Sequence, residues 1–294
     1  MIAGLKLSIY WGLQPVLLIT AVGIWYADPT FELTYLYLII GVQLVLGMIE
    51  HYSPARPEWL IRTRQKSINV ILVFFLTLIA LTLANFYVEW LEAPLAVFRN
   101  TVGLDIWPHH WPILAQLLMV FFASEFIWYW MHRSQHRFTW VWRLSGHGVH
   151  HSFKKLNALN FGLNHPIEYF FILLPSILVE LIFGVGVAAA GASVLTVIQT
   201  SIVHSNINLN SRGIGWLFTT NRYHICHHSV DLVRMLDLSL EIYQGSKACQ
   251  APGNGTNSFD HVASHEANSS FDLRFAGGSG SHIVRLNDNT QQAV

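Results

Sequence analysis

Long apolar runs, rather than the alternating pattern of a soluble domain, dominate the first two-thirds of the chain. Each of the first runs approaches or exceeds the roughly 20 residues that an α-helix needs to cross the hydrocarbon core of a bilayer. They are Leu7–Tyr26, Leu33–Ile49, Ile68–Val88 and Trp111–Met131. The pattern predicts a transmembrane helix over each run.

A further run, Ile167–Val203, has 37 residues, which is far longer than one crossing requires. Gly184, Gly186 and Gly191 lie near its middle, so we expect a tight helical hairpin whose small residues allow close helix packing. The whole pattern predicts about six transmembrane helices in three hairpins. The first helix is expected to be a retained anchor rather than a signal peptide, because no small-x-small cleavage site follows it.

The composition agrees with a membrane protein. Hydrophobic residues make up 52% of the 294 residues and charged residues only 12%, about half of the usual charged fraction. The formal net charge is zero, so nothing indicates a nucleic-acid partner. Two cysteines are too few for a disulfide framework and suit a reducing compartment.

The basic residues predict the orientation. They gather in the segments between the second and third helices, between the fourth and fifth, and after the last, whereas the opposite side carries only Arg99. The gathered residues are Arg56, Arg62, Arg64, Lys66, Arg133, Arg137, Arg143, Lys154, Lys155, Arg212, Arg222 and Arg234. Because cytoplasmic segments are enriched in Lys and Arg, we expect these segments on the cytoplasmic face of the membrane.

Histidine is the unusual residue, and half of the sixteen histidines fall into three clusters in these same basic segments. The clusters read HxxxH, HxxHH and HxxHH, and consist of His132 and His136; His147, His150 and His151; and His224, His227 and His228. Positions i, i+3 and i+4 share a helix face, so each cluster is predicted to aim two or three of its rings at one place.

So many imidazoles exceed the needs of one tetrahedral metal ion and suit two ions with open positions. Imidazole ligands fit iron, zinc or copper. A zinc hydrolase of the His-Glu-x-x-His type is disfavoured, because no cluster contains a glutamate general base.

In its order of clusters, the chain resembles the fatty acid hydroxylase/sterol desaturase superfamily over about residues 115–232. The resemblance extends to His151-Ser152 with Leu156-Asn157, to His165-Pro166-x-Glu168, and to His204-Ser205-Asn206. It implies that His204 is a ninth metal ligand. His165 is either a metal ligand, or a residue at the start of a helix or in contact with a metal ligand.

Two further site residues follow from the resemblance. Glu125 stands seven residues before His132, where relatives carry an acid, and two helical turns place it on the same face. We expect it to accept a hydrogen bond from the second nitrogen of a ligand. Asn208, four residues after His204, stands where some relatives have another histidine and is a candidate water-mediated contact.

The resemblance implies an all-α integral membrane protein with a cytosolic helical cap that holds two iron ions. Such an enzyme uses O2 to hydroxylate a lipid C–H bond, with electrons from an external reductase, ferredoxin or cytochrome. Desaturation of the lipid is the alternative within the family. A non-redox metal-binding protein or transporter that reuses the fold is the alternative outside it, although a transporter should carry several polar or ionisable groups at mid-membrane and Glu180 in the hairpin stands alone there. The identity of the lipid stays open.

Three regions are predicted along the chain. Residues 1–110 carry the N-terminal transmembrane helices, and residues 111–232 the histidine-bearing catalytic domain. Residues 233–294 depart from the family pattern, and from Gly245 onward they are rich in Gly, Ser and Asn with few apolar runs. We expect this tail to be largely disordered, because it lacks the apolar content that a packed structure needs.

Overall fold

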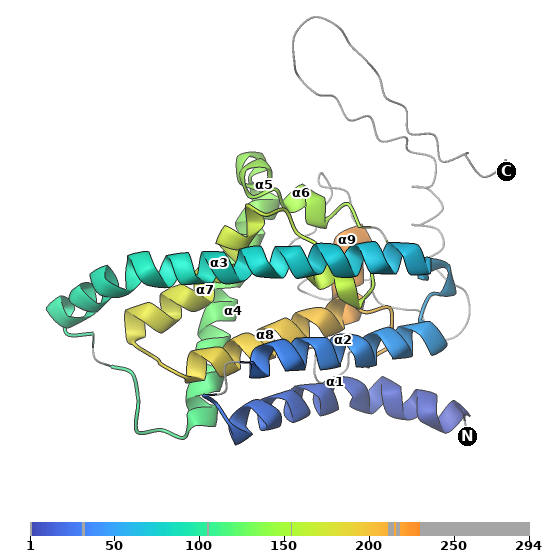
Figure 1. Ribbon diagram of the computed structural model, residues 1–294, viewed down its shortest axis with the longest axis horizontal. Helices are drawn as coiled ribbons and strands as arrows, with labels where there is room; N and C mark the ends of the chain where they lie inside the picture. Colours follow the sequence, from blue (N-terminus) through green and yellow to red (C-terminus); the bar gives the residue numbers. More distant parts are fainter. Residues whose placement is uncertain are drawn as a thin grey trace, which may run out of the picture. The chain divides into compact units, whose positions relative to one another are not determined.

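The computed structural model describes residues 2–30, 33–104, 106–153, 155–210, 215 and 218–229. Within these ranges every regular element is a helix, so the predicted all-α class is confirmed (Figure 1). The tail predicted to be disordered, residues 233–294, lies outside the described residues.

Four of the described helices are long and apolar enough to cross a membrane, and each overlaps one of the predicted runs. They are α1 (Ile2–Ala27), α2 (Thr34–Tyr52), α3 (Thr63–Val102) and α4 (Ile113–Arg137). Large apolar side chains such as Ile19, Leu44 and Phe74 are mostly exposed on them, which is the composition of a surface that faces lipid. The chain is therefore a multi-pass membrane protein.

The predicted break in the fifth run is present. Helix α7 (Glu168–Phe183) ends at Gly184, and α8 (Ala188–His204) begins after Gly186. Both glycines have positive φ, of 64° and 75°, a region that other residues rarely adopt. Arg99 donates from Nη1 to the carbonyl of Leu181 at 2.9 Å, which satisfies one of the carbonyls left free at the end of α7.

The predicted count of six crossings in three hairpins is not confirmed. Helices α7 and α8 have 16 and 17 residues, about 25 Å at 1.5 Å per residue and short of the roughly 30 Å hydrocarbon core. In addition, α3 packs against α7 rather than against its neighbour in sequence, α4. Helix α3 itself is 40 residues long and continues well beyond the apolar run that predicted it.

Helix α8 lies at the centre of the described helices and packs against α1, α2, α4 and the short helix η2 (Ala158–Gly162) (Figure 1). A Cβ atom on its Gly191 would lie 2.5 Å from Leu117 of α4 and 2.7 Å from Trp25 of α1, so only glycine allows these helices to approach so closely. Gln199 of α8 accepts a hydrogen bond from Gln14 of α1 at 3.0 Å. Such side-chain amides hold helices together where lipid provides no hydrophobic driving force.

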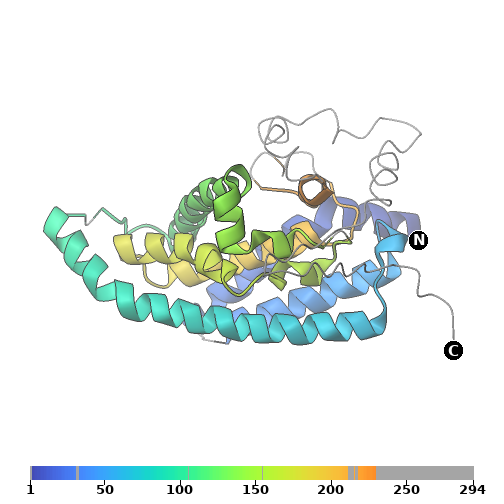
Figure 2. The ribbon, with the colours of Figure 1, turned by 90° about the horizontal axis from the view of Figure 1, so that it is seen from above.

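Helix α4 runs across the direction of α3, α7 and α8, as both ribbon views show (Figure 2). Short elements follow its C-terminal end: α5 (Thr139–Ser145), α6 (His147–His150) and η2 (Ala158–Gly162). Helix α9 (Asn221–Ser229) packs against α8, and η1 (Pro57–Trp59) connects α2 to α3. These short helices correspond to the predicted cap, whose place on the cytosolic side stays a prediction.

A buried carboxylate joins three of these parts. Oε1 of Glu50, in α2, accepts the backbone N–H groups of Ala158 and Asn206, each at 2.8 Å. Asn206 in turn accepts the backbone N–H of Arg56 at 2.9 Å and donates to its carbonyl at 2.8 Å. Glu50 therefore fixes the segment directly after His204 to α2, a role that the sequence did not indicate.

Candidate metal centre

The nine histidines predicted as ligands come together in two groups. Within each group, one nitrogen from every ring lies within 4.8 Å of the others. We call them the first group, His132, His136, His147, His151 and His227, and the second group, His150, His204, His224 and His228. Ligand nitrogens around a single ion about 2.1 Å away lie up to about 4 Å apart, which is close to this spacing.

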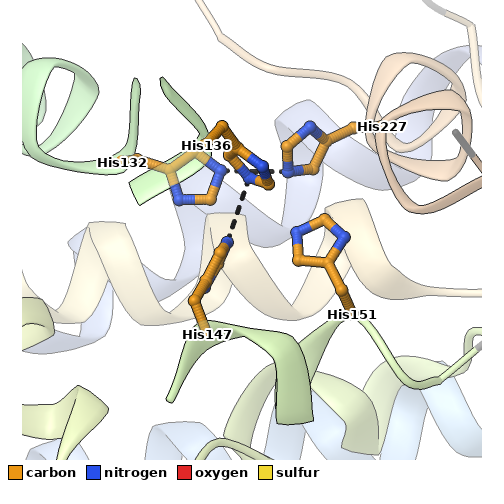
Figure 3. Close-up of side chains that lie close together, drawn as sticks. All are labelled: His132, His136, His147, His151 and His227. Atoms are coloured by element: carbon orange, nitrogen blue, oxygen red, sulfur yellow. Dashed lines mark hydrogen bonds between the residues drawn. The ribbon is translucent and has the colours of Figure 1, made fainter. Parts of the chain in front are cut away.

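The first group draws on three elements (Figure 3). His132 and His136 extend from the last turns of α4, while His147 of α6 and His151, which directly follows α6, approach from the opposite side. His227 comes from α9. The facing Nε2 atoms of His132 and His227 are 2.9 Å apart, and those of His136 and His147 are 3.0 Å apart.

The second group forms around the last residue of α8. Nδ1 of His204 donates to the carbonyl of Thr200 at 2.7 Å, which leaves the lone pair on its Nε2. That Nε2 lies 3.2 Å from Nε2 of His150 and 2.9 Å from Nε2 of His224, which itself lies 3.1 Å from Nε2 of His228. The rings of His150 and His224 thus direct nitrogens toward the lone pair of His204, an arrangement that a bound cation stabilises.

Each cluster places two of its rings in one group, as the spacing predicted. In each HxxHH cluster the i and i+4 histidines share one group and the i+3 histidine belongs to the other. The rings of His151 and His228, from different groups, stack with centroids 4.4 Å apart, so the groups adjoin.

A carboxylate orients one of these rings. Nδ1 of His147 forms a hydrogen bond with Oε1 of Glu168 at the start of α7, and both side chains are only 1% exposed. A carboxylate partner holds the proton on Nδ1 and leaves Nε2 as the donor atom for a metal, a common arrangement at metal sites. The sequence missed this role for Glu168, although the residue stands in the quoted segment that resembles the family.

Burial favours the neutral, metal-binding form of the rings outside the long helices. It lowers the pKa of His147, His151 and His227 in the first group, and of His150, His224 and His228 in the second, well below the usual value. Repulsion between neighbouring rings, were they charged, lowers each pKa further. The rings are therefore neutral near pH 7, which is the form that binds a metal ion.

The surroundings also fit a metal rather than water. Nε2 of His151 is buried and has no hydrogen-bond partner among the described residues, which is unfavourable for a polar atom unless an ion binds there. The indole of Trp142 covers one side of the first group, with its centroid 5.1 to 5.3 Å from the rings of His136, His147 and His151. This apolar wall limits access of solvent.

Two predicted site residues form no described hydrogen bond with a histidine. Glu125 accepts a hydrogen bond from Thr196 of α8 at 3.1 Å, and no described hydrogen bond joins it to a histidine. Asn208 is exposed and follows the end of α8 at His204, so the helical i+4 relation between the two residues does not apply. His165 has the helix-start role, because its Nδ1 accepts the backbone N–H of Ile167 at 3.2 Å.

The part of the chain that carries the two histidine groups is similar to known proteins. Residues 117–236 match the model of the fatty acid hydroxylase family. Over 124 residues, 42% of the chain, it is 30% identical to the ornithine lipid hydroxylase OlsE of Rhizobium tropici. Over 65 residues, 22% of the chain, it is 34% identical to a cholesterol 25-hydroxylase-like protein of Caenorhabditis elegans.

These matches cover 37% and 21% of the lengths of the two relatives, so the chain matches well under half of either protein. No solved structure matches the chain significantly. The resemblance to the superfamily is confirmed, since the family match begins in α4 and includes all nine histidines of the two groups.

Proposed function

We propose that the protein is a membrane-bound oxidoreductase that uses O2 and two metal ions, one in each histidine group, to hydroxylate a C–H bond of a lipid. The observation that carries this proposal is the convergence of nine histidines in two adjoining groups beside apolar, membrane-length helices. The family match to fatty acid hydroxylases supports the oxidoreductase class.

Iron is the metal that we propose. The donor sets consist of imidazoles, which suit iron as well as zinc and copper, and the family resemblance favours iron among these. When bound, a pair of irons supplies the activation of O2 that removal of hydrogen from an unactivated carbon requires. Five and four donors leave room for coordination positions that O2 and substrate can use.

The protein itself holds the metal ions, orients the histidine ligands and shields the metals from water. The Thr200 carbonyl and the Glu168 carboxylate fix the rings of His204 and His147, so that each presents Nε2 to the centre of its group. Burial of the rings keeps them neutral and excludes water from the metals. The apolar helices beside the groups give a lipid substrate access from the bilayer.

Metal analysis of the purified protein tests the proposal. We expect about two irons per chain, as two histidine groups with separate ligand sets predict, and O2 uptake when an electron donor and lipid are supplied. Protein in which both His136 and His204 are replaced by alanine serves as the control for adventitious metal. Stable membrane protein with no iron would refute the proposal.

Hydroxylation is preferred over desaturation, because both reported relatives are named as hydroxylases. Electrons must come from outside the chain, since no flavin, dinucleotide or haem motif is evident in its sequence. A reductase, a ferredoxin or a cytochrome is the proposed donor. A cytosolic donor requires the metal centre to face the cytoplasm, in agreement with the distribution of basic residues.

Replacement of Glu168 by glutamine is expected to lower the affinity of the first group for its metal ion by roughly 10- to 100-fold. This is the usual effect of losing a partner that orients a ligand. The amide preserves the shape of the side chain but holds the imidazole proton less strongly. Resistance of bound iron to a chelator measures the effect, with Glu58→Gln, at an exposed glutamate, as the control. Unchanged resistance in Glu168→Gln would contradict the role.

The orientation is tested by labelling single cysteines in intact cells, after both natural cysteines are replaced by serine. An impermeant reagent should modify Asn100→Cys and spare Arg62→Cys and Arg143→Cys. All three positions are exposed, and Asn100 is chosen because its neighbour Arg99 is engaged with α7. The reverse labelling pattern would place the metal centre on the side away from cytosolic electron donors.

A further inference from the structure

A cleft with several polar lining residues lies beside the metal centre, between the beginning of α3 and the segment that links His151 to η2. Its volume is about 250 Å³, and its polar lining consists of Gln65, Asn69, Ser152, Lys155, Asn157 and Asn160. None of these residues belongs to either histidine group. Ligand pockets for molecules of drug size span about 300–1,000 Å³, so this cleft fits a small polar group rather than a whole lipid.

The fold uses the oxygen atoms of two lining amides. Oδ1 of Asn157 accepts the backbone N–H of Leu159 at 3.1 Å, and Oδ1 of Asn160 accepts the backbone N–H of Asn157 at 2.6 Å. A backbone N–H can only donate, so the orientation of both amides is fixed. Their Nδ2 groups take part in no described hydrogen bond, although the two side chains are only 8% and 1% exposed.

A third lining amide is oriented in the same way. Oδ1 of Asn69, a residue only 4% exposed, accepts a hydrogen bond from Gln65 at 2.8 Å, which leaves its Nδ2 to donate. Ser152 adds no donor, because its hydroxyl already donates to the carbonyl of Val149 at 2.6 Å. Lys155 adds a charged donor. The cleft therefore presents N–H donors and a positive charge, the groups that bind the oxygens of a phosphate or carboxylate.

The surroundings favour a lipid as the source of that anion. After Asn69, α3 exposes Val70 and Ile71 at 52% and 55%, an apolar surface along which an acyl chain can lie. Basic residues at the start of α3 attract anionic headgroups to this end of the helix. Ser152 directly follows His151 of the first group, so a lipid held here lies next to the metal centre.

We propose that this cleft binds the anionic headgroup of the lipid substrate and thereby sets the substrate class. That the bound lipid is a substrate rests on the proposed function. That the cleft binds an anionic lipid does not depend on it. The lipid class is therefore one with a phosphate or carboxylate in its headgroup.

Binding of a soluble probe to the purified full-length protein tests the inference. The probe is dihexanoyl phosphatidic acid, compared with dihexanoylglycerol, which lacks the phosphate, and with inorganic phosphate, which lacks the chains. Asn157→Asp retains an oxygen for the backbone of η2, and Asp caps a helix as well as Asn does. It replaces an N–H donor by a negative charge, so we expect at least roughly a tenfold loss of affinity for phosphatidic acid.

Lys155→Gln removes the exposed charge with no change to the fold and should lower the affinity several-fold. Lys6→Gln, at an exposed basic residue of α1 outside the cleft, is the matched control and should bind as the unchanged protein does. Weak binding of dihexanoylglycerol would agree with recognition of the headgroup. Unchanged affinity in both cleft variants would overturn the inference, as would inorganic phosphate that binds as tightly as the lipid.

Iron content, measured in the same samples, separates this inference from the proposed function. Iron-loaded protein that does not bind phosphatidic acid overturns the headgroup site alone. Protein without iron that still binds the lipid through Lys155 and Asn157 supports the site and refutes the oxidoreductase.

Discussion

Replacing His227 by alanine is expected to remove the metal ion of the first group, and replacing its neighbour His228 to remove that of the second. The two residues are adjacent on α9, yet their rings belong to different groups. Each variant should retain about one iron per chain instead of two, and activity should fall by more than the roughly 100-fold upper range for residues that only orient ligands. His110→Ala, at an exposed histidine outside both groups, should keep both ions.

Double variants test the grouping itself. Adding His136→Ala to His227→Ala affects the same group, so it should release no further iron. Adding His228→Ala to His227→Ala affects both groups and should leave the protein essentially free of iron. Equal losses in the two double variants would contradict the division into groups, and full iron content in either single variant would contradict the ligand assignment.

Among these substitutions, Glu50→Leu should produce the largest loss of folding stability. The change leaves the buried backbone N–H groups of Ala158 and Asn206 without an acceptor. An unsatisfied buried donor costs about 1–3 kcal/mol, so the two together cost about 2–6 kcal/mol. We expect an apparent melting temperature lower by on the order of 10 °C. We also expect weaker binding of iron in the second group, because Asn206 follows His204 closely.

Glu50→Gln is the control for this prediction, because one oxygen, Oε1, accepts both hydrogen bonds and glutamine retains an equivalent oxygen. Its melting temperature should stay much closer to that of the unchanged protein. Thermal unfolding in detergent, with iron release followed in parallel, measures both variants. Equal stability of Glu50→Leu and the unchanged protein would show that the carboxylate does not hold η2 and the end of α8 in place.

Hydropathy alone predicted the bounds of a long helix well where the apolar run and the helix end at nearly the same residues. The run Leu33–Ile49 corresponds to α2, Thr34–Tyr52. The run Ile68–Val88, in contrast, ends where charged residues begin, whereas α3 continues to Val102. A helix passes through Glu89 and Glu92 because exposed charges on its surface do not break it, and a hydropathy pattern registers only the loss of apolar character.

The set of clustered histidines could be predicted from spacing, but their division between two groups could not. The i+3 and i+4 positions lie on neighbouring parts of one helix face, and only the placement of α6 and α9 decides which ring meets which partner. Glu168 and Glu50 escaped prediction for a related reason. Their partners, His147 and Asn206, are 21 and 156 residues away along the chain, and local patterns contain no information about such contacts.

The most direct test of the central claim is the fate of O2 in cells that express the protein. Cells with the unchanged protein and with the inactive His227→Ala and His228→Ala double variant are grown under dioxygen labelled with heavy oxygen, and their lipids are compared by mass spectrometry. The proposed function predicts a lipid that carries one labelled hydroxyl group only in cells with the unchanged protein. A product that has lost two hydrogens without gaining label would indicate a desaturase, and identical lipids in both cultures would contradict the enzyme.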